Sequence, residues 1–231
     1  EPEVKDGEAL LTKGVDYTLA YADNTNAGTA TVTVTGNGNY SGTQEKTFTI
    51  NKAALTVIPE ADQSKTYGAT DPILTYAVTG AVDGETTAFT GTLVRAEGET
   101  VGTYAITQGG LALIDNAPFL AANYALVFTD GVTFAITAKN ASTLTIAAIA
   151  PVTYDGTAHM PEPEVKDGDT LLTKGVNYAL SYADNTNAGT ATVTVTGLGN
   201  YSGTQDTTFT INKATATVTP DAGQNEVFGA A

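Results

Sequence analysis

The chain has 231 residues, with ten Lys and Arg against 25 Asp and Glu, a formal net charge of −15, and no cysteine or tryptophan. This negative charge repels phosphate backbones and anionic lipid headgroups, so it argues against nucleic-acid and electrostatic membrane binding. No apolar run approaches the roughly 20 residues that a membrane-spanning helix needs. The absence of cysteine excludes disulfides, zinc–thiolate sites, iron–sulfur clusters and thiol nucleophiles.

Threonine is the unusual component, because 43 residues are Thr, and this β-branched residue favours strands over helices. Valine and threonine alternate at residues 31–35 and again at 192–196, which is typical of a half-buried strand. The same rhythm predicts strands at residues 47–50, 74–78 and 132–137. Turn signals separate these runs at Asp6-Gly7, Asn26-Ala27-Gly28, Asn37-Gly38, Asp83-Gly84, Asp130-Gly131 and Asp155-Gly156. We therefore expect an all-β protein.

An internal repeat defines the organisation of the chain. Residues 1–53 recur at 162–214, an offset of 161, and the two stretches differ at eight positions, which leaves 53 − 8 = 45 identities. Residues 143–161 precede the second stretch and have no counterpart before Glu1, so we interpret the first copy as N-terminally incomplete and the chain as an excerpt. The segment between the copies is a different domain, and Thr217–Pro220 align with its start at Thr56–Pro59.

These observations predict four segments: a first repeat at 1–53, a middle domain at 54–139, a second repeat at 140–214, and the stub of another middle-type domain at 215–231. Units of about 75–90 residues with roughly seven short strands predict tandem immunoglobulin-like antiparallel β-sandwiches.

Two families resemble these segments. The two repeats are similar to YDG-type bacterial immunoglobulin-like modules through Val152–Ala158, Asp167-Gly168, Leu172–Gly175, Tyr178, Tyr182, Asn185–Ala191 and Gly199–Thr204. The middle domain resembles the MBG family of bacterial surface modules through Lys65–Gly68, Asp71-Pro72, Leu74–Tyr76, Gly102–Ile106, Asn123-Tyr124 and Phe134–Thr137. The resemblance implies a place in tandem arrays of large secreted or wall-attached bacterial proteins, often adhesin-like, in which such modules act as stalks.

We predict no catalytic, cofactor or metal residues and no enzyme activity. His159 is the single histidine and is interpreted as an exposed turn residue, because general-base catalysis needs an oriented partner and a nucleophile. Residues 23–28 and 184–189 superficially resemble a calcium loop, but Thr25 and Ala27 stand where an EF-hand requires oxygen ligands. A hairpin loop is therefore predicted, with calcium held by several loops as the alternative.

Paired carboxylates suggest glycoside hydrolysis, yet Glu1, Glu3 and Asp6 recur as Glu162, Glu164 and Asp167. Duplication marks them as parts of a module rather than of one active site. Most of the eleven tyrosines are predicted to pack their rings and expose their hydroxyls rather than to form a glycan platform.

Lys52 and Lys213 end the last strand of each repeat. An isopeptide bond from either lysine is one hypothesis, and a solvated residue at the domain junction is the other.

The function predicted from these features is a non-catalytic stalk or spacer of an extracellular, bacterial cell-surface or secreted protein, whose partners are the neighbouring repeats. Short joints such as residues 51–54 are expected to limit bending. One alternative is binding of a host glycan or surface protein by the middle domain. Another is a fibre subunit that assembles by β-strand addition, with the incomplete first repeat as acceptor and residues 215–219 as donor.

Overall fold

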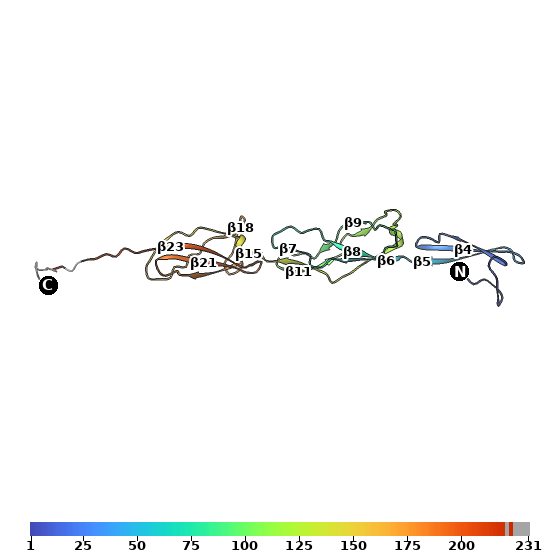
Figure 1. Ribbon diagram of the computed structural model, residues 1–231, viewed down its shortest axis with the longest axis horizontal. Helices are drawn as coiled ribbons and strands as arrows, with labels where there is room; N and C mark the ends of the chain where they lie inside the picture. Colours follow the sequence, from blue (N-terminus) through green and yellow to red (C-terminus); the bar gives the residue numbers. More distant parts are fainter. Residues whose placement is uncertain (220–221, 224–231) are drawn as a thin grey trace. The chain divides into compact units, whose positions relative to one another are not determined.

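The computed structural model describes residues 1–219 and 222–223, and these are built from short strands and turns (Figure 1). Two single-turn 3-10 helices occur among them and no α-helix, so the all-β prediction is confirmed. Within these residues, no helix has the length and apolar character needed to cross a membrane. The predicted stub at 215–231 lies partly outside the described residues; residues 215–219 form no strand and are exposed.

The chain packs into two compact units, which are described separately. Unit 1 contains residues 1–64, 71–98 and 103–135, and unit 2 contains residues 65–70, 99–102 and those from 136 onward. The units do not follow the four predicted segments, whose boundaries stay a prediction.

The first repeat lies in unit 1 and contains a hairpin and a three-stranded antiparallel sheet. The hairpin joins β1 (Lys5–Asp6) to β2 (Ala9–Leu10), and the sheet has the order β3 (Tyr17–Ala22), β4 (Gly28–Gly36), β5 (Thr43–Ile50). Gly7 turns the hairpin with a φ of 59°, a backbone conformation that favours glycine. On β4, Ala30 and Val32 are buried while the alternating threonines are not, as the period-2 pattern predicts.

The middle domain continues from the first repeat after two residues, since β5 ends at Ile50 and β6 begins at Ala53. A second three-stranded sheet has the order β13-β6-β8, and two further sheets have the orders β12-β9 and β10-β11-β14-β7. Leu55, Phe119 and Tyr124 form a buried cluster, in which the two aromatic rings stack 4.8 Å apart. The strands and the 3-10 helix are β6 (Ala53–Pro59), β7 (Ser64–Thr66), β8 (Tyr76–Thr79), β9 (Phe89–Thr90), β10 (Val94–Arg95), β11 (Gly102–Thr107), β12 (Ala112–Leu113), η1 (Ala121–Asn123), β13 (Tyr124–Phe128) and β14 (Thr133–Thr137).

The second repeat lies in unit 2, where two sheets enclose one core. One sheet has the order β16-β18-β19 and the other β17-β23-β21-β20, and β15 pairs with β22. Val165 of the first sheet and Val195 of the second are both fully buried in the same cluster. The elements are β15 (Lys139–Asn140), η2 (Ala141–Thr143), β16 (Thr145–Ile146), β17 (Val152–Thr153), β18 (Val165–Asp167), β19 (Thr170–Leu171), β20 (Tyr178–Ala183), β21 (Gly189–Gly197), β22 (Tyr201–Ser202) and β23 (Thr204–Asn212).

The sheets are antiparallel, as predicted, except at three places. Three strand pairs are parallel: β6 with β13, β15 with β22, and β17 with β23. In each pair a long connection separates the two strands, and parallel pairing needs such a crossover. The local turn signals that predict hairpins carry no information about these distant pairings.

The two repeats share their sequence but not their burial. Phe48 is 40% exposed, whereas its counterpart Phe209 is 3% exposed. Val34 is half-buried and its counterpart Val195 is fully buried. The difference arises from residues 140–153, an opening segment that packs on the second repeat. Ala141 and Leu144 belong to the cluster of Val195, while Ile149 and Val152 pack around Phe209.

Substitution of the two phenylalanines tests this difference. Phe209→Ala should destabilise the second repeat by about 3–5 kcal/mol, the usual cost of emptying a buried aromatic site. Phe48→Ala should cost about 1 kcal/mol or less in the first repeat, because that ring is already partly hydrated. Hydrogen exchange of the β21 and β4 amides in increasing urea measures each effect. Equal losses from the two substitutions would contradict the assigned burial.

Candidate functional site

The described residues of unit 2 include a joint between the middle domain and the second repeat. Residues 65–70 and 99–102 of the middle domain belong to this unit together with the repeat. Tyr67 packs against the core cluster of the second repeat and meets Tyr201 edge to face, with ring centroids 5.5 Å apart and planes at 74°. Such an arrangement contributes about 1 kcal/mol beyond the apolar area it buries. The middle domain thus adds an aromatic side chain to the core of its neighbour.

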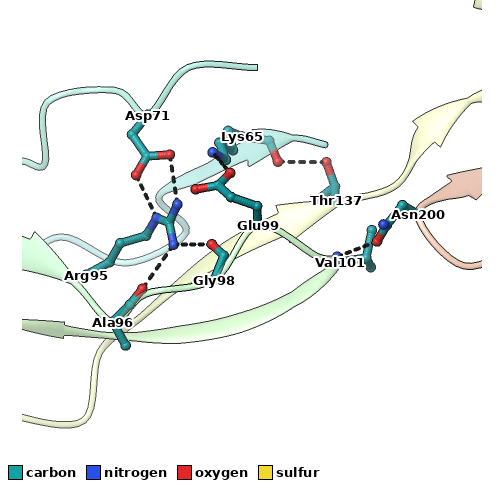
Figure 2. A network of polar contacts seen from close by, with 9 residues as sticks. All are labelled: Lys65, Asp71, Arg95, Ala96, Gly98, Glu99, Val101, Thr137 and Asn200. Atoms are coloured by element: carbon teal, nitrogen blue, oxygen red, sulfur yellow. Dashed lines mark hydrogen bonds and ion pairs between the residues drawn. The ribbon is translucent and has the colours of Figure 1, made fainter. Parts of the chain in front are cut away.

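Asn200 fixes the polar part of this joint. Its Oδ1 accepts a hydrogen bond from the Val101 amide at 2.9 Å (Figure 2). Its carbonyl accepts one from the Lys139 amide at 3.0 Å. The strand β15, which begins at Lys139, pairs in parallel with β22, and Lys139 lies opposite Tyr201 in the register. Because β14 ends at Thr137 and β15 begins at Lys139, one residue separates strands of the two domains. The connection between the two strands is therefore short.

A charged cluster lies beside this joint. Lys139 Nζ pairs with Asp167 Oδ1, and the other carboxylate oxygen of Asp167 accepts a hydrogen bond from the Tyr201 hydroxyl at 3.1 Å. Burial of the ring and the adjacent carboxylate raise the pKa of Tyr201 to about 12, because both disfavour a phenolate. The cluster therefore holds Tyr201 protonated against Tyr67 over the whole ordinary pH range.

Lys65 is a buried cation of unit 2. It is 8% exposed and forms an ion pair with Glu99, while its carbonyl accepts a hydrogen bond from the Thr137 hydroxyl at 3.2 Å (Figure 2). This pair joins the two middle-domain loops that contact the second repeat. Pairing with a carboxylate offsets the cost of removing an ammonium group from water.

Arg95 lies in unit 1 and is the chain's one arginine. Its guanidinium donates to both carboxylate oxygens of Asp71, at 2.7 and 3.1 Å, and to the carbonyls of Ala96 and Gly98 (Figure 2). It also lies over the Tyr104 ring, 5.1 Å from the centroid. A bidentate, stacked guanidinium of this kind fixes a loop, and lysine cannot reproduce the geometry.

A second joint lies within unit 1, between the first repeat and the middle domain. Asn123, in η1, accepts a hydrogen bond from the Ala27 amide at 2.8 Å and donates one to Asn26 Oδ1 at 3.0 Å. Residues 26 and 27 belong to the loop that resembles a calcium site. The loop therefore contacts the neighbouring domain.

Each of the two loops, 23–28 and 184–189, contains one non-glycine residue in the left-handed conformation. Asp23 and Asp184 have φ angles of 54° and 55°, and the asparagines do not have positive φ. Short aspartate side chains tolerate this conformation through local hydrogen bonds. Among the described residues, no three acidic or histidine side chains gather into a metal-binding group. The calcium alternative stays a prediction without a site.

His159 is not the exposed turn residue that we expected. Its side chain is 16% exposed, and its Nε2 lies 3.4 Å from Asp155 Oδ1 without hydrogen-bond geometry. The His159 amide donates to the Asn185 carbonyl, and the Asn185 side chain donates to the His159 carbonyl, both at 2.8 Å. The backbone of this segment is thus tied to the loop at 184–189, and the ring is covered as a result.

The repeated carboxylates form ion pairs instead of facing one another across a cleft. Glu1 and Glu162 pair with Lys13 and Lys174, and Glu164 pairs with Lys166 at 3.1 Å. Each pair recurs in both repeats, with Glu3 and Lys5 2.9 Å apart in the first. All of these pairs are exposed, so each contributes little to stability.

Lys52 and Lys213 are exposed. An isopeptide bond forms in an apolar core, so their exposure supports the solvated junction and gives the bond no support. Among the tyrosines, Tyr17, Tyr124, Tyr178 and Tyr201 are buried, whereas Tyr21 and Tyr154 are about 40% exposed.

The middle domain has both joints at its ends and a Tyr67-Gly68-Ala69 turn after β7. Residues 55–135 match the family model of the MBG domain (YGX type). This match confirms the MBG resemblance of the middle domain, while the YDG-type resemblance of the repeats stays a prediction. No curated protein matches the chain.

Sequence reasoning missed the residues that join the MBG domain to its neighbours. Asn123 and Asn200 belong to the Asn-Tyr pairs that carry the family resemblances, but a motif does not reveal a partner about 100 residues away. The sequence does single out Arg95, because it is the one arginine in an acidic chain. Nothing in the sequence singles out Lys139 and Asp167, since their pairing depends on the parallel contact of β15 with β22.

Substitution of Asn200 tests the joint of unit 2. Asn200→Ala removes the acceptor of the Val101 amide, and a lost hydrogen bond of about 1 kcal/mol should accelerate exchange of that amide about fivefold. The matched control is Asn39→Ala, because Asn39 is the exposed counterpart in the first repeat. Unchanged protection of Val101 would contradict the role assigned to Asn200.

The raised pKa of Tyr201 predicts a dependence of stability on pH. The folded state holds this proton more tightly than the unfolded state, whose tyrosine pKa is near 10, so stabilisation is complete below pH 10 and is lost as the pH rises through about 12. The full difference corresponds to about 3 kcal/mol. Urea unfolding of unit 2 at pH 9 and 11.5 should show about 2 kcal/mol of this loss, because pH 11.5 is still below the folded pKa. Tyr201→Phe should reduce the slope, and an unchanged slope would oppose the assignment.

Proposed function

We propose that this chain is a non-catalytic spacer segment of a bacterial cell-surface or secreted protein, built from tandem immunoglobulin-like β-sandwiches. The observation that carries the proposal is the pair of specific joints on the MBG domain. At each joint an asparagine side chain accepts a hydrogen bond from the adjoining domain: Asn123 of the MBG domain at one and Asn200 of the second repeat at the other. One or two residues separate the flanking strands. A spacer needs joints of this kind, because a flexible linker does not hold a distal domain at a fixed distance.

The sandwich architecture is supported by the second repeat, whose two sheets share one core. An immunoglobulin-like unit keeps its two ends at opposite edges of the sandwich, so tandem units extend a chain economically. The duplication of a whole repeat with 45 identities favours this role over an active site, because a reaction needs one site and a spacer gains length from each copy.

Charge and composition support an exposed location. The chain carries 25 acidic residues and a net charge of −15, which keeps closely spaced domains soluble and discourages association. Threonines on the outer faces of β4 and β21 hydrate those faces without further charge. The match to the MBG domain model suggests a repeat module of a surface protein. An extracellular position on a bacterial surface follows as part of the proposal.

The stiffness of the joint in unit 1 tests the spacer function. Spin labels on Thr18→Cys and Ala125→Cys, both at exposed positions, report the distance between the first repeat and the MBG domain. We expect one narrow distance distribution. Asn123→Ala removes two hydrogen bonds of about 1 kcal/mol each, so the docked arrangement should become about 30-fold less favoured and the distribution should broaden.

The chain provides a matched control for this measurement. Asn26→Ala should broaden the distribution, because Asn26 accepts from Asn123, whereas Asn187→Ala changes its counterpart in the second repeat and should not. A distribution that is broad in the unsubstituted chain would contradict the spacer function. Equal effects of Asn26→Ala and Asn187→Ala would contradict the role of the joint.

A further inference from the structure

The chain enters and leaves the second repeat through neighbouring segments that run in the same direction. On entry, β15 pairs in parallel with β22, and Lys139 lies opposite Tyr201. Near the exit, β17 pairs in parallel with β23. The opening segment, residues 140–153, therefore lies beside the closing segment, residues 200–212, at both of its ends.

Main-chain hydrogen bonds join the two segments at these ends. At the entry the Lys139 amide donates to the Asn200 carbonyl at 3.0 Å, and near the exit the Tyr154 amide donates to the Asn212 carbonyl at 2.9 Å. Bonds of this kind run between paired strands and not along them. A force directed along the strands therefore loads both ends of the pairing at the same time.

A side chain of the closing segment adds two bonds between these ends. The Gln205 amide of β23, with its nitrogen facing the opening segment, donates to the carbonyls of Leu144 and Ala141 at 3.0 and 2.6 Å. Ala141 and Leu144 are 0% and 4% exposed. Displacement of the opening segment would leave these buried carbonyls without a partner, which is costly.

Apolar side chains interlock along the same two segments. Leu144 of the opening segment and Tyr201 of the closing segment belong to one buried cluster. Further along, Ile149 and Val152 pack against the cluster that contains Phe209. Because a protein core is close-packed, one segment cannot slide past the other until these side chains leave their sites.

Tension on the chain pulls the two segments in opposite directions along their length. The opening segment is pulled toward its first residue and the closing segment toward its last. Because they are parallel neighbours, this load is a shear, and the contacts at both ends and between them must yield together. Strands that are pulled apart from one end lose their contacts one after another, and so they separate at a lower force.

We propose that the second repeat is a load-bearing module, in which the opening and closing segments form a shear clamp that resists unfolding when the chain is pulled. This function goes beyond that of a spacer, because a spacer maintains a distance and needs no resistance to tension. The width of a spin-label distance distribution and the lifetime under force are separate measurements, so either function can fail without the other.

The direction of pulling tests the shear clamp in the full chain. The chain has no cysteine, so pairs of introduced cysteines attach the handles of optical tweezers at chosen exposed positions. Thr137→Cys with Lys213→Cys loads the two segments along their length. Ala188→Cys with Lys213→Cys instead separates β21 from β23 at one end, where Gly189 lies opposite Ile211.

The measured quantity is the lifetime of the folded repeat at the same constant force in the two directions. Lifetimes under force follow the unfolding rate, and several hydrogen bonds must break together only in the first direction. We therefore expect a lifetime at least about 100-fold longer when the segments are pulled along their length. Equal lifetimes in the two directions would overturn the proposal.

Two substitutions at one exposed position test the bond near the exit. Tyr154→Pro removes the amide that donates to Asn212, whereas Tyr154→Ala removes the same ring and keeps the amide. With handles at positions 137 and 213, the proline variant should have a lifetime about fivefold shorter than the alanine variant. Equal lifetimes of the two folded variants would contradict the shear clamp.

A second matched pair tests the bonds between the ends. Gln205→Ala removes both bonds to the opening segment and should shorten the lifetime about tenfold, whereas Thr208→Ala changes an exposed position of the same strand and should not. NMR spectra of the free variants check their folding. If Tyr154→Pro does not fold, this pair and the direction of pulling decide the proposal, and equal lifetimes of Gln205→Ala and Thr208→Ala would overturn it.

Discussion

The four-stranded sheet of the second repeat has one apolar face that must be shielded from water, and this constraint governs how the rest of the repeat packs. Alternation along β21 directs Val193 and Val195 to one side, where both are fully buried, and directs threonines to the other. The opening segment covers this face with Leu144 and Ile146. Burial of these side chains contributes most of the stabilisation, because the hydrogen bonds exchanged with water contribute little net free energy.

The joint between the MBG domain and the second repeat is an extension of the same core. The ring of Tyr201 lies among the buried residues and also contacts Tyr67 of the MBG domain. Its hydroxyl is held by Asp167, which is in turn paired with Lys139 at the junction. A displacement of the MBG residues 65–70 that contact this ring therefore disturbs the core of the repeat.

Sequence reasoning predicted the strands best where the pattern is local. The alternation at residues 31–35 and 192–196 corresponds to β4 and β21, whereas the strand expected at 74–78 begins only at Tyr76. Contacts between distant residues were beyond its reach: the parallel pairing of β6 with β13, the bridging of Asn26 by Asn123, and the tie between His159 and Asn185. Each depends on which distant segments the fold brings together, and local residue propensities do not encode those contacts.

The sequence by itself determined an all-β chain, the duplicated repeat and the MBG character of residues 55–135, because periodicity, identity and family motifs are properties of the order of residues. Only the tertiary structure decided which copy of a repeated residue is buried. Phe48 and Phe209 have nearly identical sequence neighbours, yet one is 40% exposed and the other 3%. The reason is that burial depends on what packs against a side chain, and the opening segment covers one copy of the two.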